Sequence, residues 1–158
     1  MLFDFQPKYL DFHFTIDFNF LADCVSKNHL EHTISWDYMK HQSLDSVFQI
    51  KKINTDKRFH KILEKLDQDF NTDPVTGALK QRTDISVFFS MMAGSKSTLH
   101  KDIEDVHIIG CLGTTIYLIE DQMITVTPGD RLFIKRGTNH KAISMSPRIV
   151  MSYGVYHD

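Results

Sequence analysis

From residue 84 onward, short apolar stretches alternate with turn-forming residues at an even spacing. The stretches are rich in β-branched and aromatic residues, which favour strands, and each is short for a helix. Pro128-Gly129-Asp130 and Gly137 mark two of the turns. Several short strands in such a series are typical of an all-β sandwich or barrel. We expect strands at 85–93, 106–111, 114–119, 123–127, 131–134, 141–145 and 148–156.

The first 83 residues have a mixed pattern, and we expect them to brace the outside of the β structure. Apolar and polar residues alternate over 12–18, which predicts a half-buried strand. Asn19 could then cap a short helix over 20–26.

A second helix is predicted from about 56 to 70, where apolar residues recur at helical spacing after Thr55 as a cap. A short strand is expected at 33–36, whereas the apolar run at 43–52 does not decide between helix and strand. Together these patterns predict one domain, 1–158, with bracing elements in 1–83 and the barrel core in 84–158.

Composition and charge narrow the class of protein. The chain has 158 residues, 42% hydrophobic and 24% charged, an ordinary globular mixture that can bury its own core. Its net charge of −2 gives no electrostatic reason to expect nucleic acid or an anionic membrane as a partner. Cys24 and Cys111 form no metal-binding or disulfide spacing. With no signal peptide and no apolar run long enough to span a membrane, we expect a cytoplasmic protein.

The clearest chemical pattern is formed by His100, Asp102 and, far along the chain, His140. Residues i and i+2 of a strand point to the same side, so His100 and Asp102 can converge, and a barrel brings a third ligand from a distant strand. Two imidazoles and one carboxylate on one face leave coordination positions open, as non-haem iron(II) oxygen chemistry requires. The pattern predicts a divalent metal site, with iron(II) as the expected metal.

Both signature motifs of the cupin superfamily have counterparts in this chain. Its first motif spaces Gly, His, His, Glu and Gly, and this chain reads GSKSTLHKDIEDVHIIGCLG from Gly94 to Gly113. Its second spaces Gly, Pro, Gly, His and Asn, and this chain reads GDRLFIKRGTNHKAIS from Gly129 to Ser144. The chain therefore resembles the cupins over residues 85–156. The resemblance implies a mainly β fold, the double-stranded β-helix or jelly-roll barrel, here with a few N-terminal helices.

The departures from the two motifs point to one branch of the superfamily. Asp102 replaces the second His of the first motif, so the chain reads His-x-Asp followed by a distant His. This arrangement looks like the JmjC-like branch that uses iron(II) and 2-oxoglutarate. In that branch the resemblance implies oxidative decarboxylation of 2-oxoglutarate to succinate and hydroxylation of a bound substrate. The expected activity is therefore that of an iron(II)/2-oxoglutarate-dependent dioxygenase with a small-molecule substrate.

The co-substrate site departs from that branch. Its members usually hold the distal carboxylate of 2-oxoglutarate with Lys or Arg on the strand after the first motif, and Thr115 stands there. A dicarboxylate needs a fixed cation, for which the Arg fork is well suited. Arg148 is the best substitute, with Thr115 and Tyr117 as hydroxyl partners, although Arg148 could equally be a surface charge on an edge strand.

Several assignments near the metal stay open. His107 stands near the position of the cupin Glu and could be a fourth ligand or a residue lining the cavity. Ser152 or Tyr153 could line the pocket. An uncharged Thr115 and a ligating His107 would favour another metal-dependent cupin, such as a dioxygenase without 2-oxoglutarate or an isomerase. A non-catalytic cupin that binds a small molecule is the third reading, and a homodimer is expected because many cupins form one.

Overall fold

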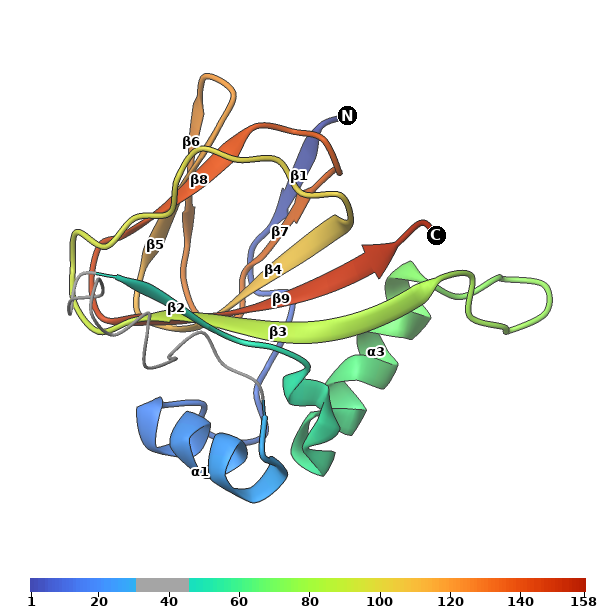
Figure 1. Cartoon of the computed structure of the whole chain (residues 1–158). Coiled ribbons are helices and arrows are strands. Elements are labelled where there is room, and N and C mark those ends of the chain that lie inside the picture. Colours follow the sequence, from blue (N-terminus) through green and yellow to red (C-terminus); the bar gives the residue numbers. More distant parts are fainter. Residues whose placement is uncertain (31–45) are drawn as a thin grey trace.

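Two antiparallel sheets form the body of the protein in the computed structural model, which describes residues 1–30 and 46–158 (Figure 1). The larger sheet has six strands in the order β1-β7-β4-β9-β3-β2, and the smaller has three in the order β6-β5-β8. The strands of the larger sheet are β1 (Phe3–Gln6), β2 (Val47–Ile50), β3 (Arg82–Ser90), β4 (Asp105–Leu112), β7 (Arg131–Ile134) and β9 (Arg148–Tyr156). Those of the smaller are β5 (Thr115–Ile119), β6 (Gln122–Val126) and β8 (His140–Ser144).

Most neighbouring strands are distant in sequence, as in a jelly roll. Strand β9, for example, lies between β3 and β4, with Ser152 opposite both Ser86 and Ile108. The two sheets close over a shared apolar core of nine buried residues from β4 to β9. This core consists of Val106, Ile108, Tyr117, Ile119, Val126, Leu132, Ile134, Ala142 and Val150. The mainly β jelly-roll fold expected from the sequence is therefore confirmed.

The helices cover the outer face of the larger sheet (Figure 1). They are α1 (Phe18–Asn28) and α3 (His60–Phe70), with the 3-10 turns η1 (Ile53–Thr55) and η2 (Lys57–Phe59) between them. Their buried residues pack against alternate residues of β9, namely Ile149, Met151, Tyr153 and Val155. Because side chains alternate along a strand, β9 is buried on both faces, by helices outside and by the cavity wall inside. Among the described residues, no helix is long and apolar enough to cross a membrane.

The N-terminal elements differ from those predicted. The strand predicted over 12–18 is absent: residues 12–17 are irregular and Phe18 begins α1, while Phe14 stacks on Phe20 and contacts Phe59 edge-on. Apolar and polar residues alternate in this segment because an irregular chain packs its aromatic rings against the helices. The helix begins earlier than predicted, because Asp17 rather than Asn19 caps it by accepting a hydrogen bond from the Phe20 N–H at 2.8 Å.

Other N-terminal predictions agree more closely with the structure. The predicted 56–70 helix is present as η2 followed by α3, and Asp56 rather than Thr55 caps it through the Arg58 N–H. The undecided run 43–52 contains strand β2. The strand expected at 33–36 lies outside the described residues, and β1 was not predicted.

The seven strands expected from residue 84 onward are all present. Strands β7 and β9 match their predicted bounds, and the others differ by a few residues at their ends. Two glycines of the second cupin motif lie on either side of β7, Gly129 at φ +90° and Gly137 at φ +77°. Glycine adopts this left-handed backbone without a steric penalty, which explains the residue type at both turns.

Candidate metal centre

His100 and His140 face each other across an isolated β-bridge. The N–H of each residue donates to the carbonyl oxygen of the other at 3.0 Å, and the two ring centroids are 4.3 Å apart. His140 begins β8, whereas His100 belongs to the irregular segment before β4. Cross-strand pairing therefore brings the two imidazoles together, although His100 itself is not part of a regular strand.

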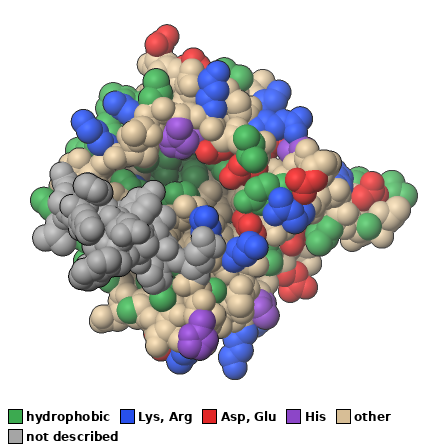
Figure 2. Space-filling view, viewed as in Figure 1, with side chains coloured by type: hydrophobic (Ala, Val, Ile, Leu, Met, Phe, Trp, Pro, Cys, Tyr) green, Lys and Arg blue, Asp and Glu red, His purple; other side chains and the backbone are tan. Residues whose placement is uncertain are grey.

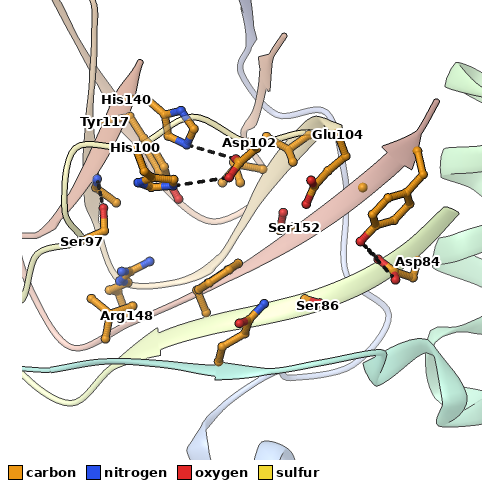
Figure 3. A pocket seen from close by; sticks show the side chains of 18 residues that line it. Asp84, Ser86, Ser97, His100, Asp102, Glu104, Tyr117, His140, Arg148 and Ser152 are labelled. Carbon is orange, nitrogen blue, oxygen red and sulfur yellow. Dashed lines mark hydrogen bonds and ion pairs between the residues drawn. The ribbon is translucent and has the colours of Figure 1, made fainter. Parts of the chain in front are cut away.

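Asp102 completes the group (Figure 3). Its Oδ1 lies 3.6 Å from His100 Nε2, and its Oδ2 lies 3.3 Å from His140 Nε2. The three potential ligand atoms lie within 4.8 Å of one another. The Gly137 N–H donates to the backbone carbonyl of Asp102 at 2.9 Å, so the turn after β7 holds this carboxylate beside the histidines. The structure thus brings together the three residues that the sequence proposed as metal ligands.

Backbone contacts orient both imidazoles for metal binding. His100 Nδ1 lies 2.6 Å from the Thr98 carbonyl oxygen, and His140 Nδ1 lies 3.0 Å from the Thr138 carbonyl oxygen. A carbonyl oxygen only accepts hydrogen bonds, so each Nδ1 carries a hydrogen. The Nε2 atom of each ring is therefore the one that can coordinate a metal. The three residues therefore offer two Nε2 atoms and one carboxylate, a set that fits a divalent transition metal with open positions.

A cavity of about 110 Å³ lies between the two sheets and contains the three residues on its wall. Strands of both sheets line it, together with the segment that carries His100 and Asp102. Figure 2 shows the hollow from outside, with a histidine and acidic side chains near its opening. A small molecule can therefore reach the candidate metal centre from solvent.

Arg148 lies inside this cavity wall and is 1% exposed. Its Nε donates to Ser90 Oγ at 3.0 Å and to Ser144 Oγ at 3.1 Å, while its Nη1 is buried without a hydrogen-bond partner. Burial lowers the pKa of Arg148, but a guanidinium stays charged at neutral pH. No carboxylate of the described residues forms an ion pair with it. A buried unpaired cation is costly, so this position favours an anionic ligand.

The two hydroxyl residues proposed beside Arg148 lie on β5. Tyr117 lines the cavity, and burial raises its pKa to about 12, so its phenol is a neutral donor. Thr115 is not among the lining residues, but it pairs across the sheet with Ser144, the acceptor of Arg148. Its Oγ1 is buried without a partner. Thr115 Oγ1 and Arg148 Nη1 are thus both buried and unsatisfied, but only Arg148 lines the cavity.

His107 lies away from the metal ligands, on the opposite face of β4. Its ring stacks on Phe70 at 4.2 Å between centroids, and its Nδ1 accepts from Arg131 Nη1 at 2.9 Å. Burial and the neighbouring Arg131 lower its pKa to about 3, so the ring is neutral. Val106 and Ile108 line the cavity instead, because side chains alternate along a strand. The reading of His107 as a fourth ligand or cavity residue is therefore corrected.

Ser152 and Tyr153 separate in the same way. Ser152 lines the cavity, whereas Tyr153 faces the helices and its hydroxyl donates to Asp67 Oδ1 at 2.7 Å. Adjacent residues of a strand point to opposite faces, so only one of them could line the pocket.

Two carboxylates in the cavity wall were not recognised from the sequence, Asp84 on β3 and Glu104 before β4. Burial raises the pKa of Asp84 and also that of Glu104. Asp84 and Ser86 alternate with the buried Ile85 and Val87, and this polar stripe in a core strand was the available signal. No motif marks Glu104.

Comparison with known proteins finds likeness in structure alone. No family model matches the chain, and no curated protein matches its sequence. The solved structure of YcfD, a ribosomal oxygenase from Escherichia coli, in complex with cobalt and succinic acid superposes with a TM-score of 0.73 at 16% identity. YcfD with cobalt and 2-oxoglutarate gives the same TM-score and identity. Each match covers 99% of this chain and 48% of YcfD, so this chain spans about half the length of YcfD.

A cupin superfamily protein from Desulfitobacterium hafniense also matches, at 19% identity over 50% of this chain and 72% of its own, with a TM-score of 0.45. The YcfD superposition, in contrast, covers 99% of this chain. The jelly-roll fold expected from the two cupin motifs is thus the fold that this chain shares with YcfD.

Proposed function

We propose that this chain is an iron(II)- and 2-oxoglutarate-dependent oxygenase. The observation that carries the proposal is Arg148, a buried guanidinium with an unpartnered Nη1 in the same cavity as His100, Asp102 and His140. A metal-binding triad alone suits many reactions, whereas a triad with a buried cation suits a chelating dicarboxylate. The fold shared with YcfD, whose structures hold cobalt with 2-oxoglutarate or succinic acid, agrees with this proposal.

In this proposal His100, Asp102 and His140 hold the iron. When bound, the metal supplies a redox-active Lewis acid with open positions for co-substrate and oxygen. Thr98 and Thr138 keep the two Nε2 atoms directed at it through their carbonyls.

Arg148 binds the distal carboxylate of 2-oxoglutarate. Ser90 and Ser144 fix its Nε, which leaves the far side of the guanidinium for the ligand. The Tyr117 phenol in the cavity wall is the further donor, and the unpartnered Thr115 hydroxyl lies on the same strand outside the cavity lining. The cation that related oxygenases carry at the position of Thr115 thus comes from β9 instead. A fixed, buried Arg fork orients a carboxylate with little reorganisation.

The alternative is a metal-dependent cupin of another class, such as a dioxygenase without 2-oxoglutarate or an isomerase. Two sequence features favoured it, a ligating His107 and the uncharged Thr115. His107 lies on the other face of β4, so Thr115 is the feature that still favours this alternative.

Binding of matched 2-oxo acids tests the proposed role of Arg148. We expect manganese-loaded protein to bind 2-oxoglutarate at least about tenfold more tightly than 2-oxobutyrate, which lacks the distal carboxylate, because a charge-assisted hydrogen bond contributes this much. Calorimetry without oxygen measures both. Arg148→Met should remove the preference while metal binding persists. Equal affinities for the two acids in the unsubstituted protein would contradict the proposal and favour the alternative.

We propose that the substrate is a small molecule and that the protein is located in the cytoplasm. Cys24 and Cys111 are free thiols in the structure, the state expected in a reducing compartment.

A further inference from the structure

Two serines lie side by side on the inner face of the larger sheet (Figure 3). Ser86 on β3 and Ser152 on β9, here called the serine pair, are direct cross-strand partners, and both line the cavity. The Cβ atoms of such partners lie about 5 Å apart. Both hydroxyls can therefore reach a single ligand atom placed above them, since an O–H···O hydrogen bond spans about 2.8 Å.

The serine pair has no hydrogen-bond partner among the described residues, although Ser152 is only 8% exposed. Three other serines around the cavity have partners. Ser90 and Ser144 accept from Arg148 Nε at 3.0 and 3.1 Å, and Ser97 accepts from a backbone N–H of β8 at 2.9 Å. Because buried polar groups are nearly always hydrogen-bonded, a ligand is the expected partner of the serine pair.

The surroundings of the serine pair favour an uncharged ligand group. Phe88 lines the cavity next to Ser86 on the same face of β3, and Ile108 lies opposite Ser152 on β4. On the other side of Ser86, Asp84 faces the cavity and would repel a carboxylate bound at the serine pair. The hydroxyls themselves carry no charge to attract a cation. A carbonyl oxygen, which is uncharged and has two lone pairs, matches two neutral donors.

The serine pair also lies away from the expected co-substrate. Ser152 is four residues from Arg148 along β9, which is roughly 13 Å in an extended strand. Arg148 Nε donates to Ser90, its own cross-strand partner, which holds the guanidinium at that end of the cavity. A dicarboxylate the length of 2-oxoglutarate spans only about 5 Å between its terminal carbons. When bound to Arg148, it therefore leaves the serine pair to a second molecule.

We propose that the serine pair binds an uncharged carbonyl oxygen of the substrate, such as that of an amide or a ketone. The inference rests on the proposed function in that it assigns a binding site to the molecule that the oxygenase oxidises. Both hydroxyls donate to the one oxygen, and this contact holds the neighbouring carbons of the substrate in the cavity that also contains His100, Asp102 and His140 (Figure 3).

The test compares cyclopentanone with methylenecyclopentane, which has a similar shape and no oxygen. Both molecules are smaller than 2-oxoglutarate, so a cavity that admits the co-substrate also admits them. Ligand-observed NMR titration of the full chain, without iron or 2-oxoglutarate, measures both affinities. The infrared carbonyl band of the ketone, recorded with protein in excess, reports hydrogen bonding to its oxygen directly, because hydrogen bonds weaken the C=O bond and lower its frequency.

Replacing both hydroxyls, by Ser86→Ala with Ser152→Ala, should weaken ketone binding about tenfold, because two hydrogen bonds are lost. The carbonyl band of the bound ketone should move to higher frequency, whereas the affinity for the alkene should not fall. Ser152→Cys alone keeps a side chain of similar size with only a weak donor, so its ketone affinity should be intermediate. The control carries Ser26→Ala and Thr125→Val, which remove two exposed hydroxyls elsewhere and should change nothing.

No detectable binding of the ketone would overturn the inference. An equal loss of ketone and alkene binding in the double variant would also overturn it, because the serines would then shape the cavity rather than bind oxygen. So would a carbonyl band that stays at the same frequency in the double variant. Because no iron or 2-oxoglutarate is present, these results are separate from the outcome for the oxygenase proposal.

Discussion

Strand β9 presents one set of side chains to the helices and another to the cavity, and the two sets differ in how well their polar atoms are satisfied. On the helix side, Ile149 and Met151 are fully buried among apolar residues, and the Tyr153 hydroxyl has a carboxylate partner. On the cavity side, Arg148 has a buried nitrogen with no partner, and Ser152 faces open space. Few buried polar atoms of a folded protein lack a hydrogen-bond partner. We therefore expect a ligand on the cavity side of β9.

The same contrast holds for β4, where His107 faces the helices and Val106 and Ile108 face the cavity. His107 accepts a hydrogen bond from Arg131 and packs against aromatic rings. The outer face of the larger sheet thus contributes stability, whereas the inner face is suited to ligand binding. Substitutions on the two faces should therefore have separable effects.

The largest expected effect is on the helix face. Ile149→Ala removes a fully buried side chain from the outer core and should lower the free energy of unfolding by about 2–5 kcal/mol. Urea denaturation measures this. Metal affinity of the folded variant should be unchanged. A variant that stays fully stable, or one that is folded yet unable to bind metal, would break the separation of the two faces.

A pH-dependent effect should arise from His107. The native ring has a pKa of about 3, below the ordinary 6.5, so the unfolded chain binds the proton first as pH falls. Stability from this residue is present above pH 6.5 and is lost toward pH 3. Between pH 7 and pH 5 the free energy of unfolding should fall by about 2 kcal/mol.

His107→Gln keeps an acceptor for Arg131 but cannot titrate, so its unfolding free energy should fall much less over the same interval. Urea denaturation at several pH values provides the comparison. An equal fall in both proteins would mean that His107 is not the buried titrating group.

Adjacent residues of β9 should differ by a smaller amount. Tyr153→Phe removes the hydrogen bond to Asp67 and leaves that acceptor to Thr83 alone, which should cost about 1 kcal/mol of unfolding free energy. Ser152→Ala should have almost no effect on stability, because its hydroxyl faces the cavity. Thermal unfolding of the two variants side by side measures the difference. The reverse order would contradict the assignment of the two faces.

A small change in stability, with no loss, is expected for Arg148→Met. This substitution loses the hydrogen bonds to Ser90 and Ser144 but also removes a buried unpaired charge, so the unfolding free energy should stay the same or rise by up to about 1 kcal/mol. Denaturant titration without ligand tests this. A loss of several kcal/mol would show that Arg148 has a structural rather than a ligand-binding role.

Sequence patterns predicted the C-terminal half of the fold well. The bounds of β7 follow from Pro128-Gly129-Asp130 before it and Gly137 after it, where turn chemistry limits the strand. The N-terminal half was predicted less well, because β1 is a short edge strand whose partner, β7, is more than a hundred residues away. No local pattern encodes such a pairing.

The candidate site divides in the same way. His100, Asp102 and His140 belong to motifs and could be proposed from spacing, whereas Asp84 and Glu104 belong to no motif and reach the cavity wall from separate segments. His107 follows Val106 directly in the strand, so their side chains point to opposite faces. The face on which His107 lies could have been inferred from this. The homodimer and the single-domain extent of 1–158 stay predictions.

The proposed function places iron on His100, Asp102 and His140 and 2-oxoglutarate on Arg148 in one cavity. Anaerobic titration with iron(II) and then 2-oxoglutarate, read as the visible charge-transfer band of the chelate, tests it most directly. We expect a band that requires both components, is absent in His100→Ala, and needs a much higher 2-oxoglutarate concentration in Arg148→Met. Iron binding with no band at any 2-oxoglutarate concentration would contradict the claim.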